Sequence, residues 1–126
     1  MYLIILASGR GSRLGNLTKN NPKCFVQLNG KHLIDYLSPS FKFFNKVFIV
    51  VGYKKDKFKK IKLNNTRIII NKNYRNTNMV ESLFCVPKNL NKDCIMVYSD
   101  ILFDTSILKD LIKRKGTIMP LNSRWL

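Results

Sequence analysis

Short apolar runs of strand length recur along the chain, and polar or amphipathic stretches separate them. Such runs lie at residues 2–7, 46–52, 66–71 and 93–100, and a fifth begins at 117–121. Continuous apolar runs are typical of strands that are buried on both faces of a parallel sheet. With helices between them, the pattern predicts an α/β fold that has a mostly parallel sheet and helices on both of its faces.

The segments between these runs carry helix and turn signals. Residues 24–37 predict a short extended piece, a turn at Asn29-Gly30 and the start of a helix that Pro39 ends. Further helices are predicted at 76–86, with Asn76 or Asn78 as its cap and Met79, Leu83 and Val86 on one face, and at 104–116, with Asp104 as its cap and Gly116 as its stop signal.

Length and composition favour one soluble domain over residues 1–126. No apolar run reaches the length of a membrane span, and the first residues lack the basic start of a secretory signal, so we expect a cytoplasmic protein. The cysteines Cys24, Cys85 and Cys94 are odd in number and lack paired spacing, which predicts buried free thiols in a reducing compartment and no zinc site.

The formal net charge of +16 allows two interpretations. One is a nucleic-acid-binding face. The other is a general excess of lysine and asparagine that involves no partner, and we favour this one. The most basic stretch, at residues 54–63, predicts a solvated helix or loop with Phe58, Ile61 and Leu63 turned inward. It lacks the interleaved aromatic residues of a single-strand-binding surface.

A glycine-rich segment, LASGRGSRLG at residues 6–15, follows the first apolar run. Its glycines let backbone amides turn toward an anion without obstruction by a Cβ, and Arg10, Arg13, Lys19 and Lys23 add positive charge. This combination suits a polyphosphate. The segment lacks the G-K-[ST] ending of a Walker A loop, and Leu14 stands where a dinucleotide fingerprint needs glycine or alanine.

The stretch from Leu6 to Leu33 resembles the opening signature of the sugar-phosphate nucleotidyltransferase superfamily, which reads L-A-A-G-x-G-x-R-L, then Thr, then P-K, then Gly before a helix. The matching residues are Gly9, Gly11, Arg13, Leu14, Thr18, Pro22, Lys23 and Gly30. The segments NTNMVESLF and VYSDILFD are similar to the branch of cytidylyltransferases that activates phosphocholine and related phosphorylated or phosphonate head groups. The resemblance implies the Rossmann-like three-layer αβα fold of MobA-like NTP transferases.

The resemblance also implies an activity and a set of site residues. A nucleoside monophosphate, with CTP as the favoured donor, would pass to a phosphorylated small molecule such as phosphocholine, a phosphonate or a sugar phosphate. Arg13 and Lys23 are the expected catalytic residues, and Asp100 is the expected Mg²⁺ ligand. The nucleotide would contact Leu6, Ala7, Ser8, Gly9, Gly11, Arg13, Lys23, Asn78 and Ser82, and Trp125 would contact the acceptor.

Several of these residues also have a purely structural interpretation. Asp100 could form a turn at a strand end, Asn78 could only cap its helix, Ser82 could be a small packed residue, and Trp125 could belong to the core. Members of the resembled family run to roughly twice this length, and their second metal-binding carboxylate lies in the C-terminal half. We therefore expect a fold truncated at its C-terminus. The alternative functions are those of a catalytically incomplete nucleotide-binding fragment that needs a partner and of a basic nucleic-acid-binding module. The partner protein considered is either a second copy of this chain, in a homo-oligomer, or a C-terminal partner segment.

Overall fold

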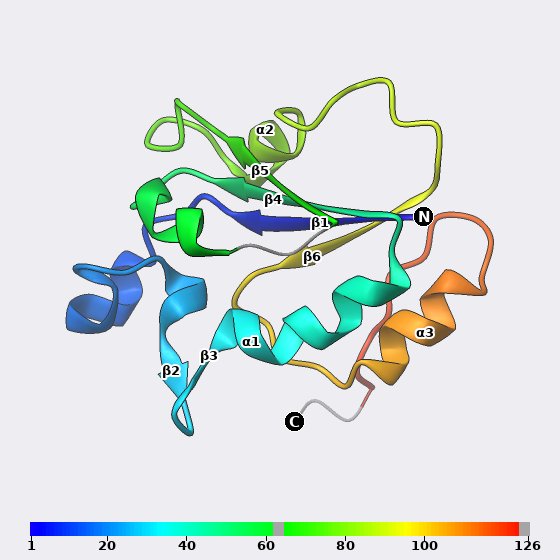
Figure 1. Cartoon of the computed structure of the whole chain (residues 1–126), viewed down its shortest axis with the longest axis horizontal. Coiled ribbons are helices and arrows are strands. Elements are labelled where there is room, and N and C mark those ends of the chain that lie inside the picture. The colour runs from blue at the N-terminus through cyan, green and yellow to red at the C-terminus, as the bar shows by residue number, and fades with distance from the viewer. Residues whose placement is uncertain (62–64, 124–126) are drawn as a thin grey trace.

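A computed structural model describes residues 1–61 and 65–123, and its centre is a four-stranded parallel sheet (Figure 1). The strand order is β5 (Thr66–Ile70), β4 (Lys46–Val51), β1 (Tyr2–Ala7) and β6 (Cys94–Tyr98). Each neighbouring pair is parallel. The first four predicted strands are therefore confirmed, and β1, the earliest in the sequence, lies between β4 and β6.

Helices cover both faces of this sheet, which confirms the three-layer prediction (Figure 1). One face packs against α1 (Leu33–Leu37), a 3₁₀ helix over Ser38–Phe43 and α3 (Ser106–Ile112), and the other face packs against α2 (Met79–Leu83). Alternate residues of β1 serve the two faces: Leu3 and Ile5 belong to the first apolar cluster, and Ile4 and Leu6 to the second. This alternation explains why the run at residues 2–7 is apolar throughout.

A small antiparallel hairpin precedes α1, and its turn lies at Asn29-Gly30 as predicted. Strands β2 (Gln27–Leu28) and β3 (Lys31–His32) are joined by Asn29 and Gly30, whose φ angles are 50° and 75°. Two consecutive left-handed residues are the geometry of the tight hairpin turn that Asn-Gly favours. Helix α1 then ends at Leu37, before Pro39.

The predicted fifth strand at 117–121 is wrong, because these residues form no strand. Met119 is 77% exposed and Leu121 is 80% exposed, and no described strand pairs with the segment. A strand requires a neighbour that accepts and donates backbone hydrogen bonds, and Pro120 also removes one donor.

The predicted helices at 76–86 and 104–116 are shorter than expected. Helix α2 begins after Asn78, as predicted, but Met79 is 55% exposed and does not share the buried face with Leu83 and Val86. Before α3, Asp104 Oδ1 accepts a hydrogen bond from Ser106 N at 2.8 Å, although the cap position itself belongs to Thr105. The first turn of α3 is thus stabilised by Asp104 from one residue further upstream.

The expectations for the basic stretch and for the cysteines are confirmed in part. Residues Lys55–Lys60 form a 3₁₀ helix with Phe58 fully buried, as predicted for the basic stretch, and Leu63 lies outside the described residues. All three cysteines are free. Only Cys24 is buried, so the prediction of buried thiols is wrong for Cys85 and Cys94. Among the described residues, no helix has the length and apolar character needed to cross a membrane.

Candidate functional site

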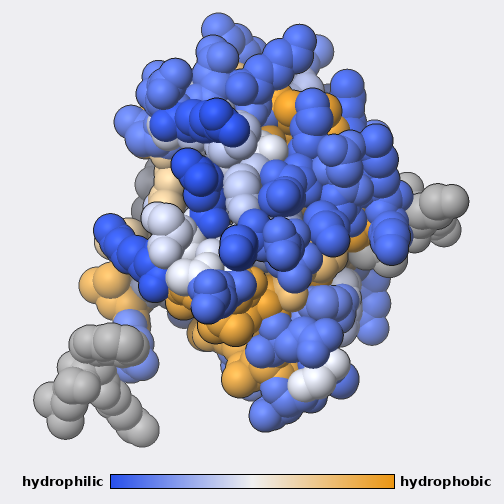
Figure 2. Space-filling model, turned by 90° about the vertical axis from the view of Figure 1, so that its left-hand side faces the viewer, coloured by the Kyte–Doolittle hydropathy of each residue, from blue (hydrophilic) through white to orange (hydrophobic). Residues whose placement is uncertain are grey.

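The carboxyl ends of the parallel strands bring the predicted site residues to one edge of the sheet. Leu6 in β1 pairs with Tyr98 in β6, so the segments that follow these strands leave the sheet side by side. One of them is the glycine-rich loop (residues 8–19), and the other carries Asp100. Figure 2 looks onto this edge and shows a mainly hydrophilic surface with an apolar patch below it. The shared edge predicted for the loop and Asp100 is confirmed.

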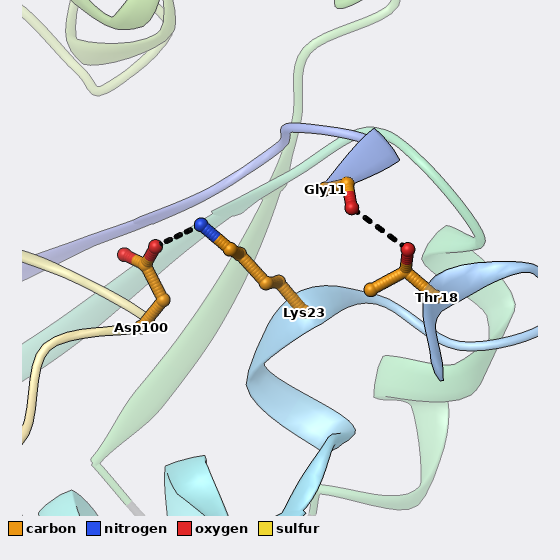
Figure 3. Close-up of polar contacts among 4 residues, drawn as sticks. All are labelled: Gly11, Thr18, Lys23 and Asp100. Carbon is orange, nitrogen blue, oxygen red and sulfur yellow. Dashed lines mark hydrogen bonds and ion pairs between the residues drawn. The ribbon is translucent and has the colours of Figure 1, made fainter. Parts of the chain in front are cut away.

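The glycine-rich loop owes its shape to two left-handed glycines and one threonine. Gly11 has a φ of 65° and precedes a 3₁₀ helix over Ser12–Thr18, which is kinked at Gly15 with a φ of 53°. Thr18 Oγ1 donates to Gly11 O at 2.8 Å (Figure 3). The φ of residue 11 would strain any other residue type, and a Cβ there would lie 3.0 Å from Thr18 Cγ2 and 3.2 Å from Lys23 Cγ, so both side chains would have to shift slightly.

Lys23 and Asp100 form an ion pair across this edge (Figure 3). Lys23 begins a short 3₁₀ helix, Lys23–Phe25, that the buried residues Pro22 and Cys24 hold in place. Asp100 lies two residues after the end of β6, in a turn. The side chains of Lys23 and Asp100 are 35% and 29% exposed, so both charged groups remain open to a ligand.

Cys24 lies beneath this pair and is chemically inert. Burial raises the pKa of its thiol to about 12, and the negative charge of Asp100 adds to the increase. A thiol with such a pKa stays protonated at neutral pH and is a poor nucleophile. Cys24 therefore acts as an apolar anchor for the segment that carries Lys23.

Ser8 and Ser82, two of the predicted nucleotide contacts, belong to a buried hydrogen-bond network. Their Oγ atoms lie 2.7 Å apart, and Asn71 Nδ2 donates to Ser82 Oγ at 3.0 Å and to Thr77 Oγ1 at 2.9 Å. Ser82 is 1% exposed and Asn71 is 3% exposed. The side chain of Ser82 thus joins α2 to the start of the glycine-rich loop and to the segment after β5.

Asn78 caps α2 and stays at the surface. Its Oδ1 accepts hydrogen bonds from Val80 N at 2.9 Å and Glu81 N at 3.1 Å, while Glu81 Oε2 accepts one from Asn78 N at 2.9 Å. This reciprocal arrangement is a capping box, so the capping interpretation of Asn78 is confirmed. Its exposed Nδ2 donates to no other described residue and is available to a ligand.

The remaining predicted residues lie on or near the loop, with one exception. Leu6 and Ala7 are buried at the end of β1, so only their backbone could reach a ligand. Arg13 is exposed, and its guanidinium forms no hydrogen bond or ion pair with another described residue. A Cβ at Gly9 would meet nothing within 4 Å, so packing within the chain does not require glycine there. Trp125 lies outside the described residues.

Sequence reasoning missed Tyr53, which lies two residues after the end of β4. Its ring is one wall of an open depression of about 230 Å³ beside the loop. The depression is lined by Arg10, Ser12, Gly15, Asn16, Thr18, Lys19 and Tyr53. The sequence signal that could have indicated this residue is the Gly52-Tyr53 pair after a buried strand. Glycine at such a place marks a site where another part of the chain or a ligand comes close to the backbone.

A divalent cation is the cofactor expected at this edge, and Asp100 is suited to bind one. The described residues contain no group of three or more histidine, cysteine, aspartate or glutamate side chains that could enclose a metal. Mg²⁺ commonly binds through one or two carboxylates, completed by phosphate oxygens and water. A lone carboxylate beside a cationic loop fits this kind of shared site and does not fit an all-protein metal site.

A glycine-rich loop after the central strand of a parallel sheet, facing an acidic residue after the neighbouring strand, defines an α/β nucleotidyltransferase fold. The model of the MobA-like NTP transferase domain matches residues 3–119, and the chain belongs to this family. The resemblance drawn from residues 6–33 is therefore confirmed.

The names of several similar proteins state an enzymatic activity. The chain is 38% identical over 125 residues to a CTP:phosphoglutamine cytidylyltransferase of Campylobacter jejuni, covering 91% of this chain and 49% of that protein. It is 35% identical over 116 residues to the choline-phosphate cytidylyltransferase of Streptococcus pneumoniae, covering 90% of this chain and 51% of that protein. The chain therefore spans about half the length of the curated relatives it matches.

Solved structures agree with this assignment. The CTP:phosphocholine cytidylyltransferase of Streptococcus pneumoniae superposes with a TM-score of 0.71 and 37% identity, over 79% of this chain and 44% of that one. The inositol-1-phosphate CTP transferase of T. maritima superposes with a TM-score of 0.74 and 27% identity, over 91% of this chain and 49% of that one.

Proposed function

We propose that this chain binds CTP and belongs to an enzyme that transfers CMP to a phosphorylated small molecule and releases pyrophosphate. The observation that carries the proposal is the ion pair of Lys23 and Asp100 beside the glycine-rich loop. It supplies one cation for phosphate and one carboxylate for a metal at the same edge of the sheet. The cytidylyltransferase names of the relatives support CTP as the donor.

The residues of the loop would bind the triphosphate. Glycine at position 9 is not needed for packing, which suggests that a ligand approaches the backbone there. The exposed Arg13 would hold the β and γ phosphates through its planar fork of donors. Leu6, Ala7, Ser8 and the Nδ2 group of Asn78 would contact the base or ribose, and Ser82 would hold Ser8 in place.

The reaction would be an attack on the α-phosphorus by a phosphate or phosphonate oxygen of the acceptor, with pyrophosphate as the leaving group. Lys23 would lie near the α-phosphate and offset the charge that develops there, while the loop fixes the triphosphate for attack. A magnesium ion at Asp100 would neutralise phosphate charge. In the free chain Lys23 and Asp100 satisfy each other, and each would exchange this partner for a group of the bound nucleotide.

Calorimetric titration of each nucleoside triphosphate in the presence of Mg²⁺ tests the proposal. We expect CTP to bind more tightly than ATP, GTP or UTP. We expect Lys23→Ala and Asp100→Asn to weaken CTP binding. The matched controls Lys46→Ala and Asp93→Asn change exposed residues at the opposite edge of the sheet, and we expect them to leave binding unchanged. Unchanged CTP binding in Lys23→Ala would refute the site.

A second candidate function is nucleotide binding without transfer by this chain alone. It is favoured by the lack, among the described residues, of a cluster of side chains that could enclose a metal, and by a match to about half of each of these two relatives. Pyrophosphate release distinguishes the two functions when it is measured with phosphocholine, aminoethylphosphonate or a sugar 1-phosphate as acceptor. Release by this chain alone supports transfer. Release only after addition of the C-terminal half of a relative supports the binding domain. The acceptor role of Trp125 and the choice among acceptors are part of the proposal.

A further inference from the structure

Tyr53 contacts both ends of the glycine-rich loop. Its backbone N–H donates to Ser8 O at 3.1 Å, and its side-chain hydroxyl donates to Lys19 O at 2.6 Å. Ser8 and Lys19 are the first and last residues of the loop. A single residue on β4's carboxyl end therefore ties together two points of the chain that are separated by the whole loop.

The ring of Tyr53 is itself held in place. Gly52 leaves room for Tyr74 to pack closely, because a Cβ at residue 52 would lie 2.4 Å from Tyr74 Cβ and 2.9 Å from Ser8 O. The rings of Tyr53 and Tyr74 are 6.5 Å apart. The guanidinium of Arg10 lies 5.8 Å from the centroid of the Tyr53 ring, within the range of a cation–π contact. These contacts fix the hydroxyl where it meets Lys19 O.

We propose that Tyr53 is a positioning residue for the triphosphate and that it acts by closing the glycine-rich loop before the nucleotide arrives. The inference rests on the proposed function of the loop. A loop whose ends are already joined loses less conformational freedom when it binds, so its amides bind a ligand more tightly. The hydroxyl of Tyr53 donates to a carbonyl of its own chain and acts on the ligand through the loop.

Tyr53→Phe tests this role because it removes the hydroxyl and keeps the ring. The matched control is Tyr36→Phe, since the hydroxyl of Tyr36 also donates to a backbone carbonyl, Leu28 O, at 2.7 Å. Loss of one neutral hydrogen bond predicts CTP binding about 2- to 10-fold weaker in Tyr53→Phe, measured by calorimetry with Mg²⁺ present. We expect CTP binding by Tyr36→Phe to match the wild type.

Two further measurements separate positioning from general stability. CMP lacks the β and γ phosphates, so its affinity should change less than that of CTP in Tyr53→Phe. Without any nucleotide, the loop amides of Leu14 and Lys19, which donate to Gly11 O and Asn16 O, should exchange with solvent faster in Tyr53→Phe than in the wild type. Melting temperatures of both tyrosine variants show whether their folds are equally intact.

The outcomes distinguish this inference from the proposed function. If the wild type fails to bind CTP, the proposed function fails and this inference fails with it. If the wild type binds CTP and Tyr53→Phe binds it equally well, only the positioning role is overturned. An equal loss in Tyr36→Phe, or an equal loss of CTP and CMP affinity in Tyr53→Phe, also overturns it. Unchanged exchange at Leu14 and Lys19 refutes the closure of the loop.

Discussion

The glycine-rich loop and the segment after β6 leave the sheet at the same edge but are held very differently. In the loop, Thr18 bonds to Gly11, and Tyr53 bonds to both loop ends. In residues 101–123, the buried side chain is Leu108, and the exposed apolar residues are Ile101, Leu102, Ile107, Ile118, Met119 and Leu121. The loop is thus built by contacts within the chain, whereas much apolar surface near β6 has no cover among the described residues.

The loop and residues 101–123 thus differ in how fully the described chain supports them. The backbone of the loop that is proposed to bind the triphosphate is held by contacts within the described chain. Clusters of exposed apolar side chains mark surfaces that contact another molecule or segment. We therefore expect substitutions on the loop side to alter stability and nucleotide binding, and substitutions of the exposed apolar residues in 101–123 to have little effect on the stability of this chain.

The largest expected difference is in stability. Ile49 in β4 is fully buried, and Ile49→Ala should lower the free energy of unfolding by about 2–5 kcal/mol through lost burial and a cavity. Met119 is 77% exposed, and Met119→Ala should change it by less than about 0.5 kcal/mol. Urea unfolding followed by circular dichroism measures both values. A comparable loss in the two variants would contradict the contrast.

Substitution by alanine should affect stability at one glycine of this edge and CTP affinity at another. Gly52→Ala places a Cβ 2.4 Å from Tyr74 Cβ and should lower the free energy of unfolding by about 1–3 kcal/mol. Gly9→Ala meets nothing within 4 Å and should unfold like the wild type, while its affinity for CTP falls. Thermal denaturation and calorimetric titration of the two variants test this pair. A lower free energy of unfolding in Gly9→Ala would contradict the open space around residue 9.

Cys24 predicts a pH dependence. Burial raises the pKa of its thiol from 9.0 to about 12, so between these values the unfolded chain releases the proton first and stability falls as the pH rises. At pH 10 the loss from this group is about 1.4 kcal/mol. Unfolding free energies at pH 8 and pH 10 should therefore fall less in Cys24→Ala than in the wild type. An equal fall in the two proteins would contradict this prediction.

The smallest effect concerns two threonines. Thr18→Val removes the hydrogen bond to Gly11 O and keeps the side-chain shape. It should lower the free energy of unfolding by about 1 kcal/mol. Thr105 at the start of α3 makes no side-chain capping bond, so Thr105→Val should have almost no effect on stability. Paired denaturation curves compare the two. If Thr105→Val is the more destabilising variant, the segment after β6 is better held than its contacts suggest.

Most of the fold could be predicted from the sequence because its strands are continuous apolar runs. Their buried position in a parallel sheet leaves few other interpretations, and Asn29-Gly30 marks its turn by backbone conformation alone. The predicted strand at 117–121 is wrong because an apolar run alone does not make a strand. An apolar run becomes a strand only where a neighbouring strand is present, and none of the described strands pairs with these residues.

The candidate site could be predicted in part. The placement of Lys23 opposite Asp100 follows from parallel topology, which sends the ends of β1 and β6 to one edge. The contact between Tyr53 and Lys19 could not be foreseen, since a hydroxyl bonding to a distant backbone carbonyl leaves no periodic pattern. The sequence left open whether Ser82 is packed or contacts the nucleotide, because its burial depends on Asn71, whose side chain reaches it from another element.

The arrangement of the sheet has a consequence for how the chain acquires its structure. Strand β1 is synthesised before both of its neighbours, because β4 begins at Lys46 and β6 ends at Tyr98. Closing such long intervals slows folding and leaves the apolar segment from Tyr2 to Ala7 without its lateral partners until those strands have been made. On the ribosome this segment is therefore exposed to chaperones that bind extended apolar chains.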